Sequence, residues 1–192
     1  QLMIRFEQVT KQFGRRTVLD DISFEIQKGE VFAIVGPSGT GKSVTLKHMV
    51  RLLTPTAGRV LIDEVVVNQT NGAELERLRE RFGYLFQGGA LLAWMNVFEN
   101  VALPLREKTR LGEEQIARKV RETLAMVGLD NEGEKMPAEI SGGMQKRAGL
   151  ARAIVRGPEI VLYDEPTSGL DPVTARMIDQ LIARLNNQIG IT

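Results

Sequence analysis

The chain has 192 residues, of which 43% are hydrophobic and 26% charged, and this composition is typical of a globular domain with one substantial core. A net charge of +1 gives no indication of a nucleic-acid-binding surface, and the absence of cysteine excludes a disulfide scaffold and a cysteine metal site. No apolar run approaches the roughly 20 residues that span a bilayer, so a membrane-spanning part would have to come from another chain.

The N-terminal part of the chain predicts strands followed by a helix. Leu2–Val9 and Val18–Ile26 predict a pair of strands, and the apolar run Val31–Val35 predicts a third. After a glycine-rich loop, apolar residues at helical spacing from Leu46 to Leu53 predict a helix that ends at the turn residues 54–58. Short strands are expected at Val60–Ile62 and Val65–Val67, and a short charged helix is expected at Glu74–Arg81.

The second half of the chain is mainly helical between two strands. Phe82–Phe86 and Ile160–Tyr163 predict these strands, and residues 88–157 between them have helical patterns. Asp171 and Pro172 are typical first residues of a last helix. Strands that alternate with helices favour an α/β fold with a parallel sheet, in which residues 88–157 form an inserted lobe.

The glycine-rich loop predicts a phosphate-binding site. Its sequence is Gly36-Pro37-Ser38-Gly39-Thr40-Gly41-Lys42-Ser43, between a predicted strand and a predicted helix. Glycines let several backbone N–H groups point at one anion, and the helix adds the positive end of its dipole. In such a P-loop Lys42 would contact the β and γ phosphates, and the Ser43 hydroxyl would bind Mg²⁺. The alternative is a glycine-rich turn that only caps a helix.

Two acids follow the strand Ile160–Tyr163. Asp164 and Glu165 lie at its carboxyl end, where ligands bind in open α/β sheets. Adjacent strand residues point to opposite faces, so Asp164 could hold Mg²⁺ while Glu165 acts as general base toward the attacking water. The alternative is an acidic turn before Pro166.

A second candidate anion site is Ser141-Gly142-Gly143-Met144-Gln145. Ser141 is a good N-cap, and the two glycines leave the N-terminus of the following helix bare. The alternative is a capped helix with a flexible entry. Two anion sites beside one acidic pair suggest that the second anion site serves the nucleotide of a neighbouring molecule.

Two further segments, Gln87 and Ser168-Gly169-Leu170-Asp171, complete a set of motifs. Their order is the one seen in ATP-binding-cassette ATPases, and the chain resembles this family from Leu2 to its end. The resemblance implies an α/β fold: a P-loop NTPase core with a mostly parallel sheet, an N-terminal antiparallel β subdomain and an inserted α-helical subdomain. It also implies a single nucleotide-binding domain over residues 1–192. Residues 1–87 and 158–192 would form the ATPase core, and residues 88–157 the helical subdomain.

The resemblance further implies ATP and Mg²⁺ as cofactors and a role for each motif residue. Phe13 would stack on adenine, although it could instead be a core residue that closes the first hairpin. The nucleotide would contact Gly36, Pro37, Ser38, Gly39, Thr40, Gly41, Lys42, Ser43 and Val44. Catalysis would involve Lys42, Gln87 and Glu165, and Mg²⁺ would be held by Ser43, Gln87 and Asp164. In a head-to-tail homodimer, Ser141, Gly142, Gly143 and Asp171 would act on the partner's nucleotide.

A finer resemblance concerns Leu85–Leu92, Asn96–Glu107 and Met144, which are similar to the Mla/Mce-type phospholipid-trafficking ATPases. It implies an integral-membrane permease and lipid-carrier components as partners, no nucleic acid, and a location on the cytoplasmic side of the inner membrane. Three alternatives stay open: an amino-acid-type importer, a soluble cassette protein that acts as a clamp in DNA repair or translation, and a nucleotide-binding module without turnover.

Two features depart from the family pattern. The family has a switch histidine on a strand after the last helix, whereas the sequence stops at Ile189–Thr192, so we expect a fragment that hydrolyses ATP poorly by itself. The only histidine, His48, is expected to be a packing residue rather than a base. Met144 stands where most relatives have glutamine.

Overall fold

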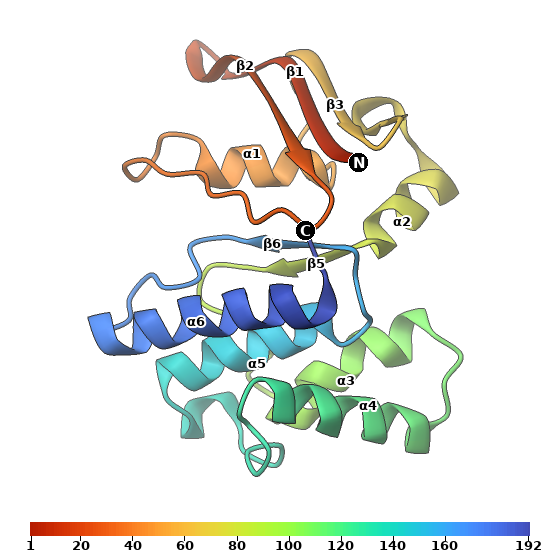
Figure 1. Cartoon of the computed structure of the whole chain (residues 1–192), viewed down its shortest axis with the longest axis vertical. Coiled ribbons are helices and arrows are strands. Elements are labelled where there is room, and N and C mark those ends of the chain that lie inside the picture. The colour runs from red at the N-terminus through yellow and green to blue at the C-terminus, as the bar shows by residue number, and fades with distance from the viewer. The chain divides into compact units, whose positions relative to one another are not determined.

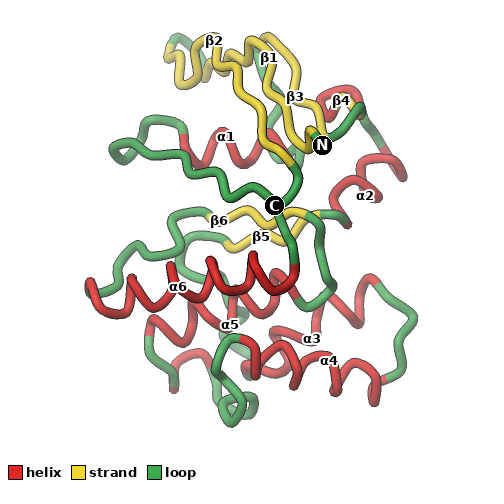
Figure 2. Tube along the Cα trace, in the orientation of Figure 1, coloured by secondary structure: helices red, strands yellow, loops and turns green.

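The structure of the chain, a computed structural model, describes all 192 residues and divides into two compact units. Unit 1 comprises Gln1–Phe82 with Ile191–Thr192, and unit 2 comprises Gly83–Gly190. Figure 1 labels their elements, and Figure 2 distinguishes helices from strands. No helix in either unit is both long and apolar enough to cross a membrane. The division into an ATPase core and a helical lobe at 88–157 stays a prediction.

Unit 1 is built on a four-stranded antiparallel sheet in the order β2-β1-β3-β4. Its elements are β1 (Leu2–Phe13), β2 (Arg16–Gln27), α1 (Lys42–Met49), β3 (Ala57–Ile62), β4 (Val65–Val66), a 3₁₀ turn (Val67–Gln69) and α2 (Gly72–Glu80). The central strand β1 pairs Phe6 with Phe24 of β2 and with Val60 of β3. Phe6 and Val60 are fully buried, so the apolar face of β1 forms the core of the predicted antiparallel subdomain.

The apolar run Val31–Val35 is not a strand, which corrects the prediction from the sequence. The sheet of unit 1 does not extend to it, and a strand exists only where a neighbour satisfies its N–H and C=O groups. Val31 is 63% exposed and Val35 is 91% exposed. Within this run, the ring of Phe32 stacks on the ring of Phe24 in β2, with centroids 5.1 Å apart.

Helix α1 ends four residues earlier than the apolar spacing predicts. It stops at Met49, and Arg51 has a left-handed backbone with φ of 52°. The N–H groups of Leu52 and Leu53 turn back to the carbonyl of Lys47, at 2.9 and 3.2 Å. This reversal satisfies the last helical carbonyls, so Leu53 lies outside the helix although its spacing fits.

Unit 2 is a cluster of helices beside two strands. Its elements are β5 (Phe82–Leu85, whose first residue belongs to unit 1), α3 (Val97–Lys108), α4 (Glu113–Met126), a 3₁₀ turn (Pro137–Glu139), α5 (Gly142–Ile154), β6 (Ile160–Tyr163) and α6 (Pro172–Ile189). Helix α5 packs on α3, α4 and α6, and β5 pairs with β6. Ile116, Val120 and Leu124 of α4, followed by Val127, are buried at helical spacing, in agreement with the helical pattern expected for residues 88–157.

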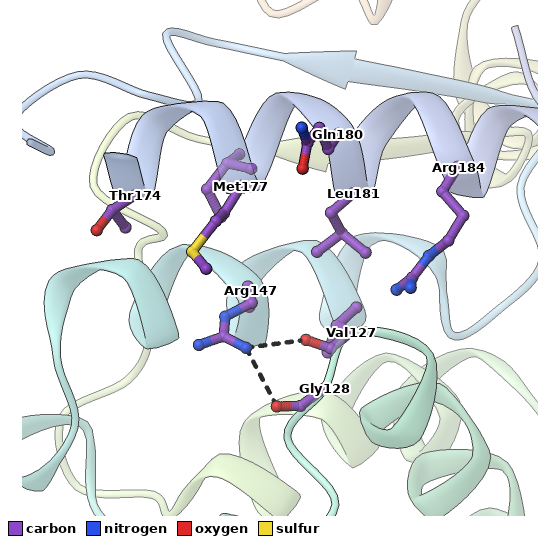
Figure 3. Close-up of a pocket in the computed structure, with 9 residues that line it drawn as sticks. Val127, Gly128, Arg147, Thr174, Met177, Gln180, Leu181 and Arg184 are labelled. Atoms are coloured by element: carbon purple, nitrogen blue, oxygen red, sulfur yellow. Dashed lines mark hydrogen bonds between the residues drawn. The ribbon is translucent and has the colours of Figure 1, made fainter. Parts of the chain in front are cut away.

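Two arginines close the C-terminal end of α4. Arg147 of α5 donates to the carbonyls of Val127 and Gly128, at 3.4 and 3.2 Å, and Arg184 of α6 donates to that of Met126 at 2.8 Å. These carbonyls have no partner within α4, so both guanidinium groups act as caps. Between the three helices lies a groove of about 480 Å³ (Figure 3), lined also by Thr174, Met177, Ile178, Gln180 and Leu181.

Asn100 holds the loop that leads into α3. Its side chain is fully buried: Oδ1 accepts from the N–H of Leu92 at 2.7 Å, and the two hydrogens of its NH2 group are shared among the carbonyls of Leu92, Met95 and Asn96 at 2.9 to 3.1 Å. The carbonyls of Leu92 and Asn96 also accept backbone bonds from Met95 and Asn100, so the amide reinforces the turns of this loop and adds a partner for the N–H of Leu92 and the carbonyl of Met95.

We expect Asn100→Ala to lower the free energy of unfolding by about 2–4 kcal/mol, because buried groups left without a partner cost about 1–3 kcal/mol each. Chemical denaturation followed by circular dichroism measures this loss. The matched control is Asn187→Ala, an exposed asparagine on α6 in the same unit, whose effect should stay within about 0.5 kcal/mol. Equal effects of the two variants would contradict the role of Asn100.

Candidate functional site

The predicted P-loop begins α1 in unit 1. Gly39 and Gly41 have φ of 81° and 101°, and Gly41 is the N-cap of the helix. A side chain at Gly41 would also come within 2.7 Å of Leu19. The glycine at this position is therefore required both by the left-handed backbone and by the close packing on β2.

The ammonium of Lys42 lies inside this loop. It donates to the carbonyls of Gly36 and Pro37, both at 2.9 Å, and the hydroxyl of Thr40 donates to Pro37 at 2.8 Å. The loop thus gathers a positive charge, exposed backbone and the N-terminus of α1 at one place. These groups fit a phosphate. The hydroxyl oxygen of Ser43, in the first turn of α1, is a ligand of the type that binds Mg²⁺.

Phe13 is at the end of β1 with 46% of its surface exposed, so it is not a core residue. The ammonium of Lys11 lies 5.1 Å from the centroid of its ring. A nucleobase can stack on an exposed ring of this kind, and the stacking of adenine on Phe13 stays a prediction.

His48 is confirmed as a packing residue. Only 1% of it is exposed, and its Nδ1 lies 2.6 Å from the carbonyl of Val44 one turn earlier in α1. Burial lowers the pKa of His48, so the neutral form is favoured.

The two acids after β6 have different surroundings in unit 2. Asp164 is 6% exposed, and its carboxylate accepts from the hydroxyl of Tyr84 at 3.4 Å. Burial and the charge of Asp164 raise the pKa of Tyr84, which keeps this hydroxyl a donor. The carboxylate of Glu165 is less buried and accepts from Nε2 of Gln87 at 3.0 Å. Asp164 therefore suits a fixed metal ligand, whereas Glu165 suits exchange of a proton with water.

The backbone of Glu165 is strained. Its φ is 50°, a left-handed conformation that costs a residue with a side chain about 1–2 kcal/mol. The carbonyl of Glu165 accepts from the N–H of Ser168 at 3.1 Å and from Nζ of Lys146 at 3.4 Å. Sequence reasoning missed Tyr84 and Lys146. The available signal for Lys146 was its position in the otherwise small and apolar face of α5.

The predicted second anion site and Asp171 form two neighbouring helix N-termini. Ser141 is the N-cap of α5 and accepts from the N–H of Met144 at 3.3 Å. Asp171 is the N-cap of α6 and accepts from two N–H groups of its first turn, each at 3.0 Å. Hydrogen bonds from Thr174 lower the pKa of Asp171. Both predicted caps are confirmed, and Gly143 packs directly against Thr174.

The structure brings Gln87 into contact with Glu165, next to Asp164, and these residues and the second anion site at Ser141 all belong to unit 2. The predicted P-loop and Phe13 belong to unit 1. A joint nucleotide site that combines the residues of both units is a proposal, as is the role of each residue in it.

A family model described as "ABC transporter" matches residues 19–168, which is most of the chain. The chain belongs to this family. It is 49% identical over 189 residues to the probable ribonucleotide transport ATP-binding protein mkl of Mycobacterium leprae, with 98% of this chain and 54% of that protein covered. It is 41% identical over 192 residues to the intermembrane phospholipid transport system ATP-binding protein MlaF of Haemophilus influenzae, with 100% of this chain and 73% of that protein covered.

A third relative is the methionine import ATP-binding protein MetN of Carboxydothermus hydrogenoformans, 46% identical over 181 residues, with 93% of this chain and 53% of that protein covered. The chain therefore spans about half the length of the mkl and MetN proteins. Among solved structures, the cassette MJ0796 in a dimeric post-hydrolysis state with ADP and Pi is similar with a TM-score of 0.87 and 36% identity, covering 98% of this chain and 84% of that one. This ABC cassette fold is the one that the sequence predicts.

The contact between α5 and α6 gives a testable prediction. A Cβ at Gly143 would lie 2.5 Å from Cγ2 of Thr174, whereas a Cβ at Gly142 would make an ordinary contact of 3.6 Å with Leu170. We expect Gly143→Ala to destabilise the chain by about 1–3 kcal/mol through overpacking. Gly142→Ala should instead stabilise it by about 0.5–1 kcal/mol through the unfolded state.

Thermal melts of the two variants measure the difference. Adding Thr174→Ser, which removes the obstructing methyl group, should restore the melting temperature of Gly143→Ala. A Gly143→Ala variant that melts at or above the parent temperature would contradict the packing described.

Proposed function

We propose that this chain is the ATP-binding and ATP-hydrolysing subunit of an ABC transporter and that it drives a separate membrane permease. The observation that carries the proposal is the pair Asp164 and Glu165, one buried beside Tyr84 and the other held by Gln87, in a chain that also has the P-loop. Two acids in such different surroundings are suited to two different tasks on one nucleotide.

In this proposal the P-loop binds the phosphates of ATP. Lys42 exchanges its bonds to loop carbonyls for bonds to the β and γ phosphates, and the N-terminus of α1 adds its N–H groups. Phe13 stacks on the adenine. Ser43, Gln87 and Asp164 would hold Mg²⁺, which would neutralise charge on the phosphates.

Glu165 then takes a proton from the attacking water. Gln87 fixes the orientation of its carboxylate through a hydrogen bond of 3.0 Å. A base that is already oriented needs no rearrangement when the proton is transferred. The products are ADP and phosphate, the molecules present in the similar MJ0796 structure.

The proposed active form is a head-to-tail dimer. The N-terminus of α5, which begins at Ser141 with two glycines, provides the anion-binding surface in unit 2, whereas the first-turn N–H groups of the neighbouring α6 are already bonded to Asp171. An incoming γ phosphate from a partner molecule would satisfy it. Dimeric cassettes among the similar structures support this arrangement.

For the transported substrate we propose a phospholipid, on the cytoplasmic side of the inner membrane and with lipid-carrier components. The support is the likeness to MlaF, which covers the whole chain and 73% of that protein, together with the local resemblance around Gln87 and Met144. The second candidate is an amino-acid importer, which the 46% identity to MetN favours.

The chemistry is tested with Glu165→Gln and Lys42→Ala in the complete protein. We expect Glu165→Gln to bind ATP as the parent does but to lose at least about 100-fold in turnover, because it removes the base and keeps the shape. Lys42→Ala should weaken ATP binding by about 10-fold or more, because it removes a charge-assisted contact. Titration with ATP and Mg²⁺ and phosphate release measure the two effects. Parent turnover in Glu165→Gln would refute its role as base.

The substrate is tested with the complete protein purified together with its permease and reconstituted in vesicles. We expect phospholipid in the vesicles to stimulate ATP turnover and bound phospholipid to be found by mass spectrometry. Methionine and ribonucleotides, offered in parallel, should have no effect. Stimulation by methionine alone would favour the importer, and failure to purify with any membrane protein would refute the transporter proposal.

A further inference from the structure

Lys146 is an unusual residue for its position. It lies on α5, five residues after the N-cap Ser141, and only 4% of it is exposed. A lysine is seldom buried unless its charge is paired, because an ammonium loses its hydration there. None of the sequence motifs assigns it a function, so its partners are the first question.

The partners of Lys146 lie at the acidic pair. Its Nζ donates to the carbonyl of Glu165 at 3.4 Å, and the carboxylates of Glu165 and Asp164 lie close enough to act on its charge. Burial lowers the pKa of Lys146, and the two negative charges oppose this effect. The ammonium of Lys146 therefore interacts both with the backbone carbonyl of Glu165 and with the negative charges of Asp164 and Glu165.

This turn needs support because Glu165 has a left-handed backbone with φ of 50°. Two donors, Lys146 and the N–H of Ser168, converge on its carbonyl, while Gln87 holds its carboxylate. Glu165 is thus held at both ends, and Lys146 connects its backbone to α5. Loss of one donor would let the peptide rotate and would carry the carboxylate with it.

We propose that Lys146 is a positioning residue that ties helix α5, which begins with the second anion site, to the backbone of the general base Glu165. The inference rests on the proposed function and deepens it. Ser141 and Lys146 are on one rigid helix, so a phosphate bound at the N-terminus of α5 and the Glu165 turn are linked by a single element. Engagement of a partner's nucleotide would thereby act on the position of the base.

The test is Lys146→Met in the complete protein, with Arg147→Met as the matched control. Arg147 is the next residue of α5, but its guanidinium caps Val127 and Gly128 and does not reach the acids. We expect Lys146→Met to lower kcat by about 10- to 100-fold, as for a displaced catalytic group, with the dissociation constant for ATP unchanged. Arg147→Met should lower the melting temperature and leave kcat unchanged.

Two further measurements separate positioning from general damage. In a Glu165→Gln background, Lys146→Met should cause little additional loss of turnover, because it acts through Glu165. Lys146→Cys is made in a complete protein whose other cysteines have been replaced, of which residues 1–192 contribute none, and it is alkylated with 2-bromoethylamine in denaturant and refolded. It should regain turnover, since the product has an ammonium at lysine length. The turnover of the alkylated variant is compared with that of parent protein refolded in the same way. This comparison tests the role of Lys146 even if Lys146→Met does not fold.

A readout without nucleotide keeps the inference independent of the proposed function. Hydrogen exchange at the N–H of Ser168, which shares the Glu165 carbonyl, should accelerate in Lys146→Met but not in Arg147→Met. If the parent protein does not hydrolyse ATP, the proposed function is refuted. The hydrogen-exchange result would still show whether Lys146 supports the carbonyl of Glu165. Parent-like kcat in folded Lys146→Met, equal losses in both variants, or unchanged exchange would overturn the inference.

Discussion

The close approach of β5 to α5 is the constraint on which the candidate site in unit 2 depends. A Cβ at Gly83 would lie 2.3 Å from the carbonyl of Ala153, and one at Gly149 would lie 2.9 Å from both the carbonyl of Gly89 and a methyl group of Leu85. Only glycine permits this distance on either side. As a result α5 lies close against β5, and the side chain of Lys146 on α5 reaches the carbonyl of Glu165 in the turn that follows β6. The position of Glu165 thus depends on two glycines, Gly83 and Gly149, that are not among the predicted site residues.

Around that turn, burial decides what each acid can do. Asp164 loses its water and is compensated by Tyr84, whereas Glu165 keeps access to solvent and is oriented by Gln87. A carboxylate fixed in the interior is already positioned as a metal ligand, while an oriented and solvent-accessible one can contact the attacking water. Membership of the ABC transporter family and this asymmetry agree, since ATP hydrolysis needs both tasks side by side.

Predictions from the sequence were right where the cause was local. Ser141 and Asp171 cap their helices as predicted, because an N-cap bonds to N–H groups two or three residues ahead. The prediction for Val31–Val35 was wrong because a strand needs a partner far along the chain: the run has the composition of a strand but no neighbour in the sheet of unit 1. The predicted end of α1 was wrong for a local reason, because the left-handed backbone of Arg51 reverses the chain after Met49 and the apolar spacing does not show this.

The sequence by itself determined the motifs, their order and hence the family, together with the hairpin and the helix caps, because glycine conformation and capping need only adjacent residues. Only the tertiary structure decided that Asp164 is buried, that Tyr84 and Lys146 support the acids, and that Phe13 is exposed. These properties depend on desolvation and on contacts between residues far apart in the chain: Tyr84 and Asp164 are 80 positions apart. No local pattern encodes such contacts, because they form only when β5, α5 and β6 are packed together.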